Sequence, residues 1–201
     1  GTAHESWEAL RESTTTPNAS RARDDLTAFY TRTAETYFRT LKEELKKAAP
    51  KQLYLGCRFA WAPERAVLAA AKYCDILSFN LYRRDVSGFT LPGEMDRPVI
   101  IGEFHFGALD RGPFHTGLVP VASQQYRAKA YKDYVLGAAK NPWLVGTHWF
   151  QYADQATTGR GDGENYQIGF LDIADTPYPE TIQASREAGS AIYASRGAAG
   201  A

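Results

Sequence analysis

Cysteine is scarce in this 201-residue sequence, which contains only Cys57 and Cys74. Both lie in apolar surroundings without CxxC spacing, which predicts buried free thiols rather than a disulfide framework or a zinc site. An excess of charge of either sign is also missing, because 23 acidic residues balance 23 basic ones along the chain. Without a basic stripe to release counterions, no nucleic-acid partner is expected, and a neutral or polar ligand fits better.

Long hydrophobic runs are absent as well. No segment approaches the roughly 20 apolar residues that a membrane span requires. The opening residues, GTAHESWEAL, lack the charged and apolar regions of a signal peptide. We therefore expect no membrane partner. What the sequence does have is 44% hydrophobic and 13% aromatic residues, which is typical of a globular domain with a real core.

The hydrophobic pattern predicts helices that alternate with strands. Apolar residues spaced three to four apart predict four helices, over residues 24–48, 63–73, 123–139 and 179–195. Short apolar runs between chain-breaking residues predict four strands, over residues 52–59, 74–82, 97–106 and 143–152. This alternation is typical of parallel β/α units, so we expect one α/β domain over residues 1–195 and a disordered tail over 196–201.

Strict alternation within each predicted strand assigns side chains to two faces. Glu103 falls on the face of Val99 and Ile101, whereas His148 falls on a face turned toward helices. One face of each strand is apolar, and the other turns polar only near the C-terminal end, as in the interior of a β/α barrel. The side chains expected around one mouth are Asn80, Tyr82, Glu103, His105, Trp149 and Gln151.

Glu103 is the candidate catalytic residue. A carboxylate among aromatic and amide groups can attack an anomeric carbon, or stabilise the positive charge that develops on the sugar ring. In this interpretation Tyr82 hydrogen-bonds to Glu103, and Trp149 forms a floor for a sugar ring. Asn80 and Gln151 would contact sugar hydroxyls.

Each of these residues also has a structural interpretation. Glu103 could be the buried ion-pair partner of Arg58, because carboxylates are almost never fully buried unless they are paired. Tyr82 and Trp149 could pack in the core, and His105 could be an ordinary hydrogen-bonded histidine. Glu103, His105 and His115 match no standard zinc spacing, so neither a metal nor another cofactor is expected.

Two long connections, over residues 83–96 and 154–176, follow the C-terminal ends of predicted strands, where loops usually bind ligands. The segment TTGRGDGENYQIG at 157–169 has neither the lysine of a P-loop nor the alternating acids of an EF-hand. It predicts a sugar-contacting loop, with plain turn chemistry as the alternative. The predicted substrate-contacting residues are Arg58, Asn80, Tyr82, His105, Trp149, Gln151, Asp154, Glu164 and Asn165.

Four stretches of the sequence, GEFHFGALDRG, GTHWFQYADQ, TTGRGDGENYQIGF and DTPYPE, resemble the C-terminal part of the catalytic barrel of glycoside hydrolase family 50, the β-agarases. More distantly, the chain is similar to the family 42 β-galactosidases of the same clan. The resemblance implies strands five to eight of a (β/α)8 TIM barrel, with Glu103 on strand seven. It further implies a retaining mechanism on β-galactosidic bonds of agarose or agaro-oligosaccharides, with Glu103 as the nucleophile.

The family's general acid/base is a glutamate that follows an asparagine at the end of strand four, and no such pair precedes the long helix of this chain. Glu5, Glu8 and Glu12 lie in a polar, loop-like stretch. A retaining enzyme needs two carboxyl groups about 5–5.5 Å apart, and four strands cannot close a barrel. We therefore expect a partial catalytic domain that acts with a complementing N-terminal half-barrel or as a homo-oligomer, from a secreted or periplasmic parent enzyme.

Two other interpretations stay open. The chain could be a catalytically silent half-barrel that binds carbohydrate or associates with itself. It could instead be a complete small α/β enzyme in which Glu103 acts alone as a base. Activity of the isolated chain, and of the chain joined to the sequence that precedes it in the source gene, separates these interpretations.

Overall fold

The computed structural model describes residues 3–93, 95–112 and 114–198. Its centre is a four-stranded sheet in the order β1-β2-β3-β4, in which every neighbouring pair is parallel. The strands are β1 (Arg58–Phe59), β2 (Leu77–Asn80), β3 (Val99–Phe104) and β4 (Leu144–Trp149). The helices are α1 (Trp7–Glu12), α2 (Arg23–Ala48), α3 (Glu64–Tyr73), α4 (Gln124–Lys140) and α5 (Pro179–Ala198).

The predicted α/β class and its parallel strands are confirmed, but β1 is much shorter than the predicted strand over 52–59. The segment before β1 is held by the turn that precedes β2 rather than by a strand. The Tyr54 amide donates to the Asp75 carboxylate at 2.8 Å, and the Tyr54 carbonyl accepts from the Asp75 amide at 2.8 Å. These bonds satisfy the Tyr54 backbone without a ladder, so the regular strand begins only at Arg58.

The two ends of the chain also differ from expectation. The stretch expected to be loop-like contains α1, whose first turn is capped by Ser6, because its hydroxyl accepts from the Ala9 amide at 3.1 Å. α5 continues to Ala198 instead of ending at Ser195, since the Arg196 guanidinium donates to carbonyls that precede β4, including that of Asn141 at 2.5 Å. The rest of the expected tail, residues 199–201, lies outside the described residues.

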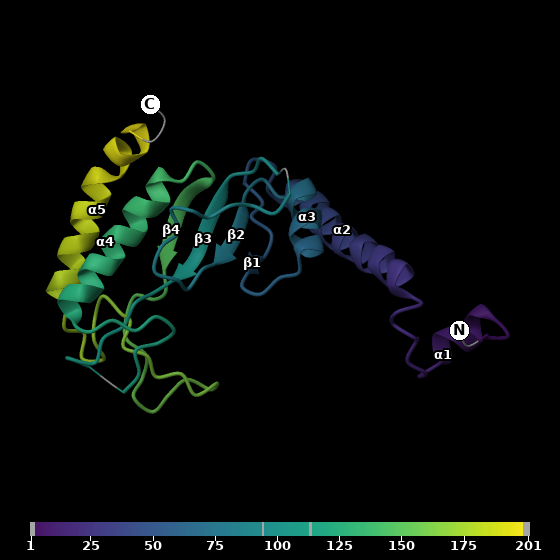
Figure 1. Cartoon of the computed structure of the whole chain (residues 1–201), viewed down its shortest axis with the longest axis horizontal. Helices are drawn as coiled ribbons and strands as arrows, with labels where there is room; N and C mark the ends of the chain where they lie inside the picture. The colour runs from purple at the N-terminus through teal and green to yellow at the C-terminus, as the bar shows by residue number, and fades with distance from the viewer. Residues whose placement is uncertain (1–2, 94, 113, 199–201) are drawn as a thin grey trace.

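Helices cover one face of the sheet in two groups, as Figure 1 shows: α4 and α5 pack together beside β3 and β4, and α2 packs on α3 beside β1. The main aromatic contact on this face joins β3 to α4. The rings of Phe104 and Tyr134 stack with centroids 4.1 Å apart and planes 4° apart. The Tyr134 hydroxyl then donates to the Leu81 carbonyl at 2.8 Å, which ties α4 to the end of β2.

An extra residue in β3 changes which side chains face the helices. Phe79 pairs with Ile101, but the next residue, Asn80, pairs with Glu103, so β3 bulges between Ile101 and Glu103. A bulge interrupts strict alternation. Ile101 and Phe104 therefore both face the helices although they are three residues apart, and Glu103 turns to the opposite face with Asn80. The prediction that Glu103 shares the face of Val99 and Ile101 is wrong for this reason.

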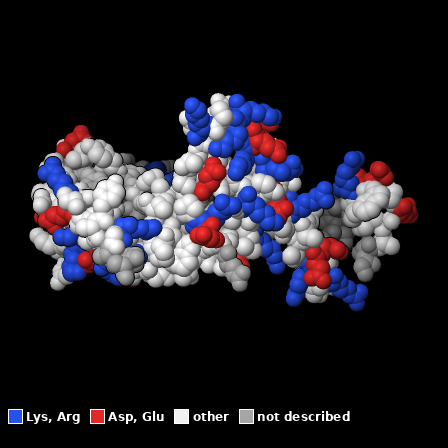
Figure 2. All heavy atoms as spheres, turned by 90° about the horizontal axis from the view of Figure 1, so that it is seen from above, with Lys and Arg blue, Asp and Glu red and all other residues white. Residues whose placement is uncertain are grey.

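The loops that follow the strands gather below the arrowheads in Figure 1. Isolated bridges join them, pairing Gly107 with Pro120, His115 with Tyr166, and Ala153 with Leu171. The surface carries charges of both signs, and on the face in Figure 2 lysines and arginines lie among aspartates and glutamates. Within the part of the chain that the structure describes, no helix combines the length and apolar character needed to cross a membrane.

We expect Phe104→Ala to lower the free energy of unfolding of the 201-residue chain by about 3–5 kcal/mol, because it deletes a buried ring and leaves a cavity. Phe104 is 1% exposed, whereas Phe29 on α2 is 71% exposed. The matched control, Phe29→Ala, should change the free energy by no more than about 0.5 kcal/mol. Urea unfolding measures both, and equal losses would contradict the packing described for β3 and α4.

Candidate active site

The Glu103 carboxylate lies at the C-terminal end of β3, where two neighbouring side chains hold it. The Tyr82 hydroxyl donates to one carboxylate oxygen at 2.6 Å, and the Arg58 guanidinium approaches the other at 2.7 Å. The Glu103 side chain is 14% exposed and that of Arg58 is 57% exposed. The hydrogen bond expected from Tyr82 is thus present, and so is the ion pair with Arg58 that the structural interpretation expected. Together the two donors fix the orientation of the carboxylate.

Tyr82 stays protonated in this arrangement. Burial is the largest cause that raises the pKa of the Tyr82 hydroxyl far above its usual range, followed by the hydrogen bond to Glu103. The charge of Glu164 raises it further. The loop that carries Glu164 contacts this region through Tyr166, whose ring lies 5.9 Å from that of His105, and the His105 ring lies 4.7 Å from that of Tyr82. A protonated hydroxyl can donate to Glu103 throughout the neutral pH range.

Asn80 lies next to Glu103 through the shifted register of β2 and β3. Its amide oxygen is buried and has no hydrogen-bond donor among the described residues. A buried acceptor without a donor is unfavourable unless water or a ligand supplies one. The position beside Glu103 therefore suits a group that donates a hydrogen bond, such as a hydroxyl.

His105 does not face the mouth. It is 1% exposed, beneath the ring of Tyr82 at a centroid distance of 4.7 Å. Its Nε2 accepts from the Leu118 amide at 2.7 Å, so the proton of the neutral ring is on Nδ1. Burial lowers the pKa of His105 to about 4. The predicted substrate contact is therefore replaced by a bond that anchors the loop after β3.

Trp149 also differs from its predicted position. Its ring lies 5.3 Å from that of Tyr131 on α4 and 5.1 Å from that of Phe104, so it packs on the helix side of the sheet. Val99 pairs with Leu144, but the next residue, Ile100, pairs with Gly146, so β4 has an extra residue that reverses its alternation before Trp149. His148, expected to face the helices, is exposed instead. The prediction that Trp149 lies at the mouth is wrong.

The residues that follow β4 turn mainly to their own loop. Asp154 is buried, and its carboxylate accepts from the Gly169 amide at 2.6 Å and from the Tyr178 hydroxyl at 2.8 Å. Burial raises the pKa of the Asp154 carboxyl, and these hydrogen bonds oppose the shift. Gln151 is half-buried and donates to the Ala153 carbonyl at 3.2 Å. The structure thus gives both side chains contacts within the segment that they begin.

The glycine-rich loop is stiffened by its own side chains. Glu164 accepts from Gln155 at 2.8 Å and pairs with Arg160 at 3.0 Å. Gln155 in turn accepts from the Tyr166 amide at 2.8 Å. Asn165, between Glu164 and Tyr166, is half-buried. The loop is therefore an ordered element near Glu103 rather than a free turn.

Arg127 is a residue that sequence reasoning missed. It is 0% exposed in α4, and its Nε donates to the Phe106 carbonyl at 2.9 Å. Burial lowers the pKa of the Arg127 guanidinium to about 10, which leaves it charged at neutral pH. One signal could have found it: Arg127 follows Gln124 at helical spacing on the face that continues to Tyr134, so the pattern places a charge on the buried face.

Within the described residues, no group of three or more histidine, cysteine, aspartate or glutamate side chains could hold a metal ion.

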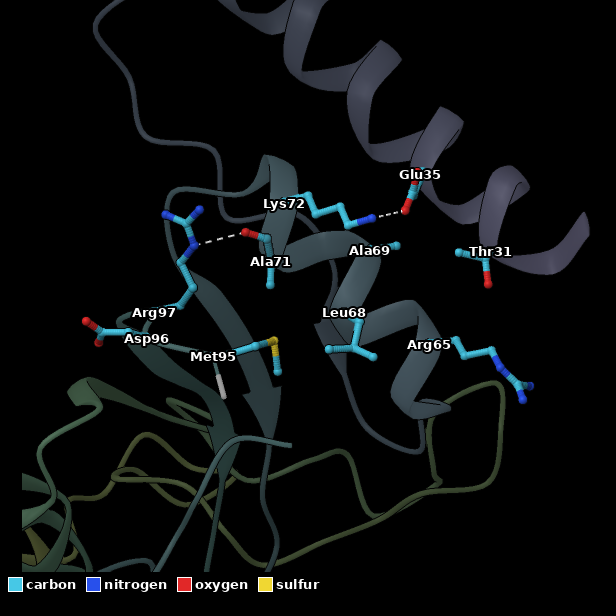
Figure 3. A pocket seen from close by; sticks show the side chains of 10 residues that line it. All are labelled: Thr31, Glu35, Arg65, Leu68, Ala69, Ala71, Lys72, Met95, Asp96 and Arg97. Carbon is cyan, nitrogen blue, oxygen red and sulfur yellow. Dashed lines mark hydrogen bonds and ion pairs between the residues drawn. The ribbon is translucent and has the colours of Figure 1, made fainter. Parts of the chain in front are cut away.

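A hollow of about 560 Å³ lies away from this site, on the outer surface beside α3, and Figure 3 shows the side chains around it. Three of its charged groups are already engaged, since Lys72 pairs with Glu35 and Arg97 donates to the Ala71 carbonyl. None of the predicted site residues lines the hollow.

The chain is similar to known agarases over most of its length, although no protein-family model matches it. β-Agarase B of Vibrio sp. (strain JT0107) is 50% identical over 164 residues, which are 78% of this chain and 17% of that protein. β-Agarase A of the same strain is 38% identical over 203 aligned positions, covering 96% of this chain and 20% of that protein. The chain spans about a fifth of the length of these relatives.

Two solved structures match nearly the whole chain. The agarase AgWH50C has a TM-score of 0.88 at 42% identity, over 97% of this chain and 29% of that one. PfGH50B has a TM-score of 0.88 at 38% identity, over 96% of this chain and 28% of that one. The described fold is therefore that of a segment within these larger chains.

We expect His105 to make the free energy of unfolding depend on pH. Because its pKa is about 4 in the folded chain against 6.5 for the free side chain, only the unfolded chain takes up the proton between these values. Above about pH 6.5 protonation of His105 does not affect the free energy of unfolding. As the pH falls toward about 4, the free energy of unfolding decreases by about 3 kcal/mol. Urea unfolding at several pH values should show a flatter profile for His105→Asn.

The matched control for that experiment is His148→Asn, because His148 is exposed. This variant should keep the pH profile of the unchanged chain. If His105→Asn and His148→Asn gave the same profile, the assignment of the pH dependence to the buried imidazole would be refuted.

Proposed function

We propose that this chain, which belongs to glycoside hydrolase family 50, the β-agarases, carries the nucleophile of a retaining hydrolase that cleaves β-galactosidic bonds of agarose or agaro-oligosaccharides. The observation that carries the proposal is the Glu103 carboxylate, held by Tyr82 and Arg58 at the C-terminal end of β3. That edge of a parallel β/α fold is where active sites form.

The proposed reaction uses Glu103 as a covalent catalyst. A carboxylate oxygen attacks the anomeric carbon while the glycosidic C–O bond breaks, and a second carboxyl group protonates the leaving oxygen. Water then hydrolyses the glycosyl ester, which releases the sugar and restores the carboxylate. Tyr82 and Arg58 support this role because they hold the carboxylate in one orientation before the substrate arrives.

Substrate contacts are proposed for Asn80, for two residues of the glycine-rich loop and for Gln151. The buried amide oxygen of Asn80 lacks a donor among the described residues, and a sugar hydroxyl would supply one. Glu164 and Asn165 precede Tyr166, whose ring packs against His105 beside Tyr82, and they are proposed to contact sugar hydroxyls at the rim. The Gln151 side chain donates one N–H to Ala153, which leaves its amide oxygen and its second N–H for the same purpose.

We further propose that the chain acts as the C-terminal half of a (β/α)8 barrel within a larger assembly. β1 and β4 are the edge strands of the sheet, and strand edges favour pairing with further strands. α2 leaves Phe29 71% exposed and Tyr37 50% exposed, an apolar surface typical of a helix that packs against more protein. The general acid/base glutamate would come from the complementing N-terminal half.

The test uses a joined polypeptide, in which residues 1–201 follow the sequence that precedes them in the source gene. We expect it to hydrolyse agaro-oligosaccharides with retention at the anomeric carbon, observed by NMR, and Glu103→Gln to lose activity by at least about 10⁴-fold, because a removed nucleophile leaves only binding and other residual catalysis. The isolated 201-residue chain should show little or no turnover.

The matched control is Glu43→Gln on the exposed surface of α2, which should keep full activity. Substantial activity in Glu103→Gln would refute the nucleophile assignment. A joined polypeptide that binds the oligosaccharide without cleaving it would favour the catalytically silent, carbohydrate-binding alternative instead.

We expect Tyr82→Phe in the joined polypeptide to lower kcat by about 10- to 100-fold, because a hydrogen bond to a charged group contributes about 1.5–3 kcal/mol. The change removes only the hydroxyl that donates to Glu103. Steady-state kinetics measure the effect, and Tyr152→Phe, at an exposed tyrosine, is the control. An unchanged kcat in Tyr82→Phe would show that this hydrogen bond does not support the nucleophile.

A further inference from the structure

Three side chains converge on two successive peptide groups at the end of the glycine-rich loop. The Trp149 indole donates to the Ile168 carbonyl at 2.8 Å. The Asp154 carboxylate accepts from the Gly169 amide at 2.6 Å, and the Arg127 guanidinium donates to the Gly169 carbonyl. The backbone of Ile168 and Gly169 is thus bonded from β4, from the segment after β4, and from α4.

Arg127 connects these bonds to the rest of the sheet. Besides Gly169, it donates to the carbonyl of Phe106 at 2.9 Å and to the side chain of Gln124 at 3.2 Å. Its guanidinium lies between two rings, 5.5 Å from the centroid of Trp149 and 5.0 Å from that of Tyr178. A buried cation with this many acceptors and two aromatic faces is held in one position.

The approach is close enough to require glycine. A Cβ at Gly169 would lie 2.3 Å from the Asp154 amide nitrogen and 2.3 Å from the Leu171 carbonyl oxygen. Asp154 is itself fixed, since it also accepts from the Tyr178 hydroxyl at 2.8 Å. The glycine, the buried acid and the buried arginine therefore depend on one another: Gly169 leaves the space in which Asp154 and Arg127 bind its backbone.

What these contacts hold in place is the loop over residues 155–167. Its two ends are joined where the Gln155 amide donates to the Tyr166 carbonyl at 3.1 Å, two residues before Ile168. Tyr166, which follows Glu164 and Asn165, places its ring 5.9 Å from that of His105, and the His105 ring lies 4.7 Å from that of Tyr82. Fixing Ile168 and Gly169 therefore fixes the position and orientation of the loop relative to Glu103.

We infer that Arg127, Trp149 and Asp154 form a clamp on Ile168 and Gly169 that positions the loop over residues 155–167 beside Glu103. All three are positioning residues. Trp149 and Asp154, for which substrate contacts were predicted, hold the loop, and the loop contacts the substrate. This inference rests on the proposed function for what the loop binds, but the clamp itself does not depend on it.

Arginine is required at the centre of the clamp for geometric reasons. Its planar group sends separate N–H donors to Phe106, Gln124 and Gly169 and presents flat faces to the two rings. A lysine ammonium is a compact point charge without a flat face, and cannot reproduce both features. Arg127→Lys therefore keeps the charge but loosens the clamp.

The experiment compares Arg127→Lys with Arg186→Lys, an exposed arginine on α5, in the joined polypeptide. Hydrogen exchange followed by mass spectrometry should show faster exchange over residues 153–171 in Arg127→Lys, with β2 and β3 unchanged. KM for an agaro-oligosaccharide should rise by about 10- to 100-fold, because positioning is lost, while kcat changes much less. Arg186→Lys should match the unchanged protein in both measurements.

Trp149→Phe is the second variant, and it decides the question if Arg127→Lys fails to fold. It removes the donor to Ile168 but keeps an aromatic ring beside Tyr131. We expect faster exchange confined to residues 153–171. A raised KM with unchanged loop exchange would overturn the clamp, because it would mean that Trp149 contacts the substrate directly.

Three further outcomes separate the clamp from the proposed function. Unchanged exchange in both variants overturns the clamp. Faster exchange throughout β2 and β3 also overturns it, because that result assigns Arg127 a general structural role. If the unaltered joined polypeptide does not cleave agaro-oligosaccharides but the variants show faster exchange confined to residues 153–171, the clamp stands and the proposed function fails.

Discussion

The extra residue in β3 between Ile101 and Glu103 is the constraint on which the site depends. Strands in a β/α layer must keep one face apolar against the helices, and β3 does so with Ile101 and, beyond the bulge, Phe104. The bulge lets the apolar face continue while Glu103 turns to the opposite face beside Asn80. Bulges next to active sites commonly redirect one side chain in this way. The carboxylate then meets Tyr82, which follows the neighbouring strand β2, and Arg58, which lies on β1 beyond it.

Much of the fold was predictable because its signals are local. Helical spacing from Leu26 to Leu45, together with Pro50, predicted α2 nearly to the residue, and short apolar runs located β2, β3 and β4. The hydrogen bond from Tyr82 to Glu103 was also predictable, because Tyr82 follows β2 and Glu103 lies at the C-terminal end of the parallel strand β3, at the same edge. These features need only the repeat of a helix or a strand and the direction of the chain.

The positions of His105 and Trp149 could not be predicted, because they depend on register. Strict alternation assumes that every strand pairs residue for residue, and a single extra residue reverses the face of everything after it. The sequence around Gly102 does not predict the bulge, since a glycine in a strand can mark a bulge, a tight bend or a close approach of another segment. For Arg127, helical spacing indicates a charge on the buried face of α4, but the backbone carbonyls that accept from it belong to distant segments and could not be named from the sequence.

The other acidic residues near the glycine-rich loop are already engaged, which limits what Glu103 can do alone. A retaining site needs a second carboxyl group that can give its proton to a leaving oxygen. Asp154 is buried and already accepts from Gly169 and Tyr178, and Glu164 is engaged by Arg160 and Gln155. Each of these acids holds the loop in shape, so releasing one for proton transfer would loosen the element that is proposed to bind the sugar. Neither Asp154 nor Glu164 therefore suits the role of the second carboxyl group in the proposed pair.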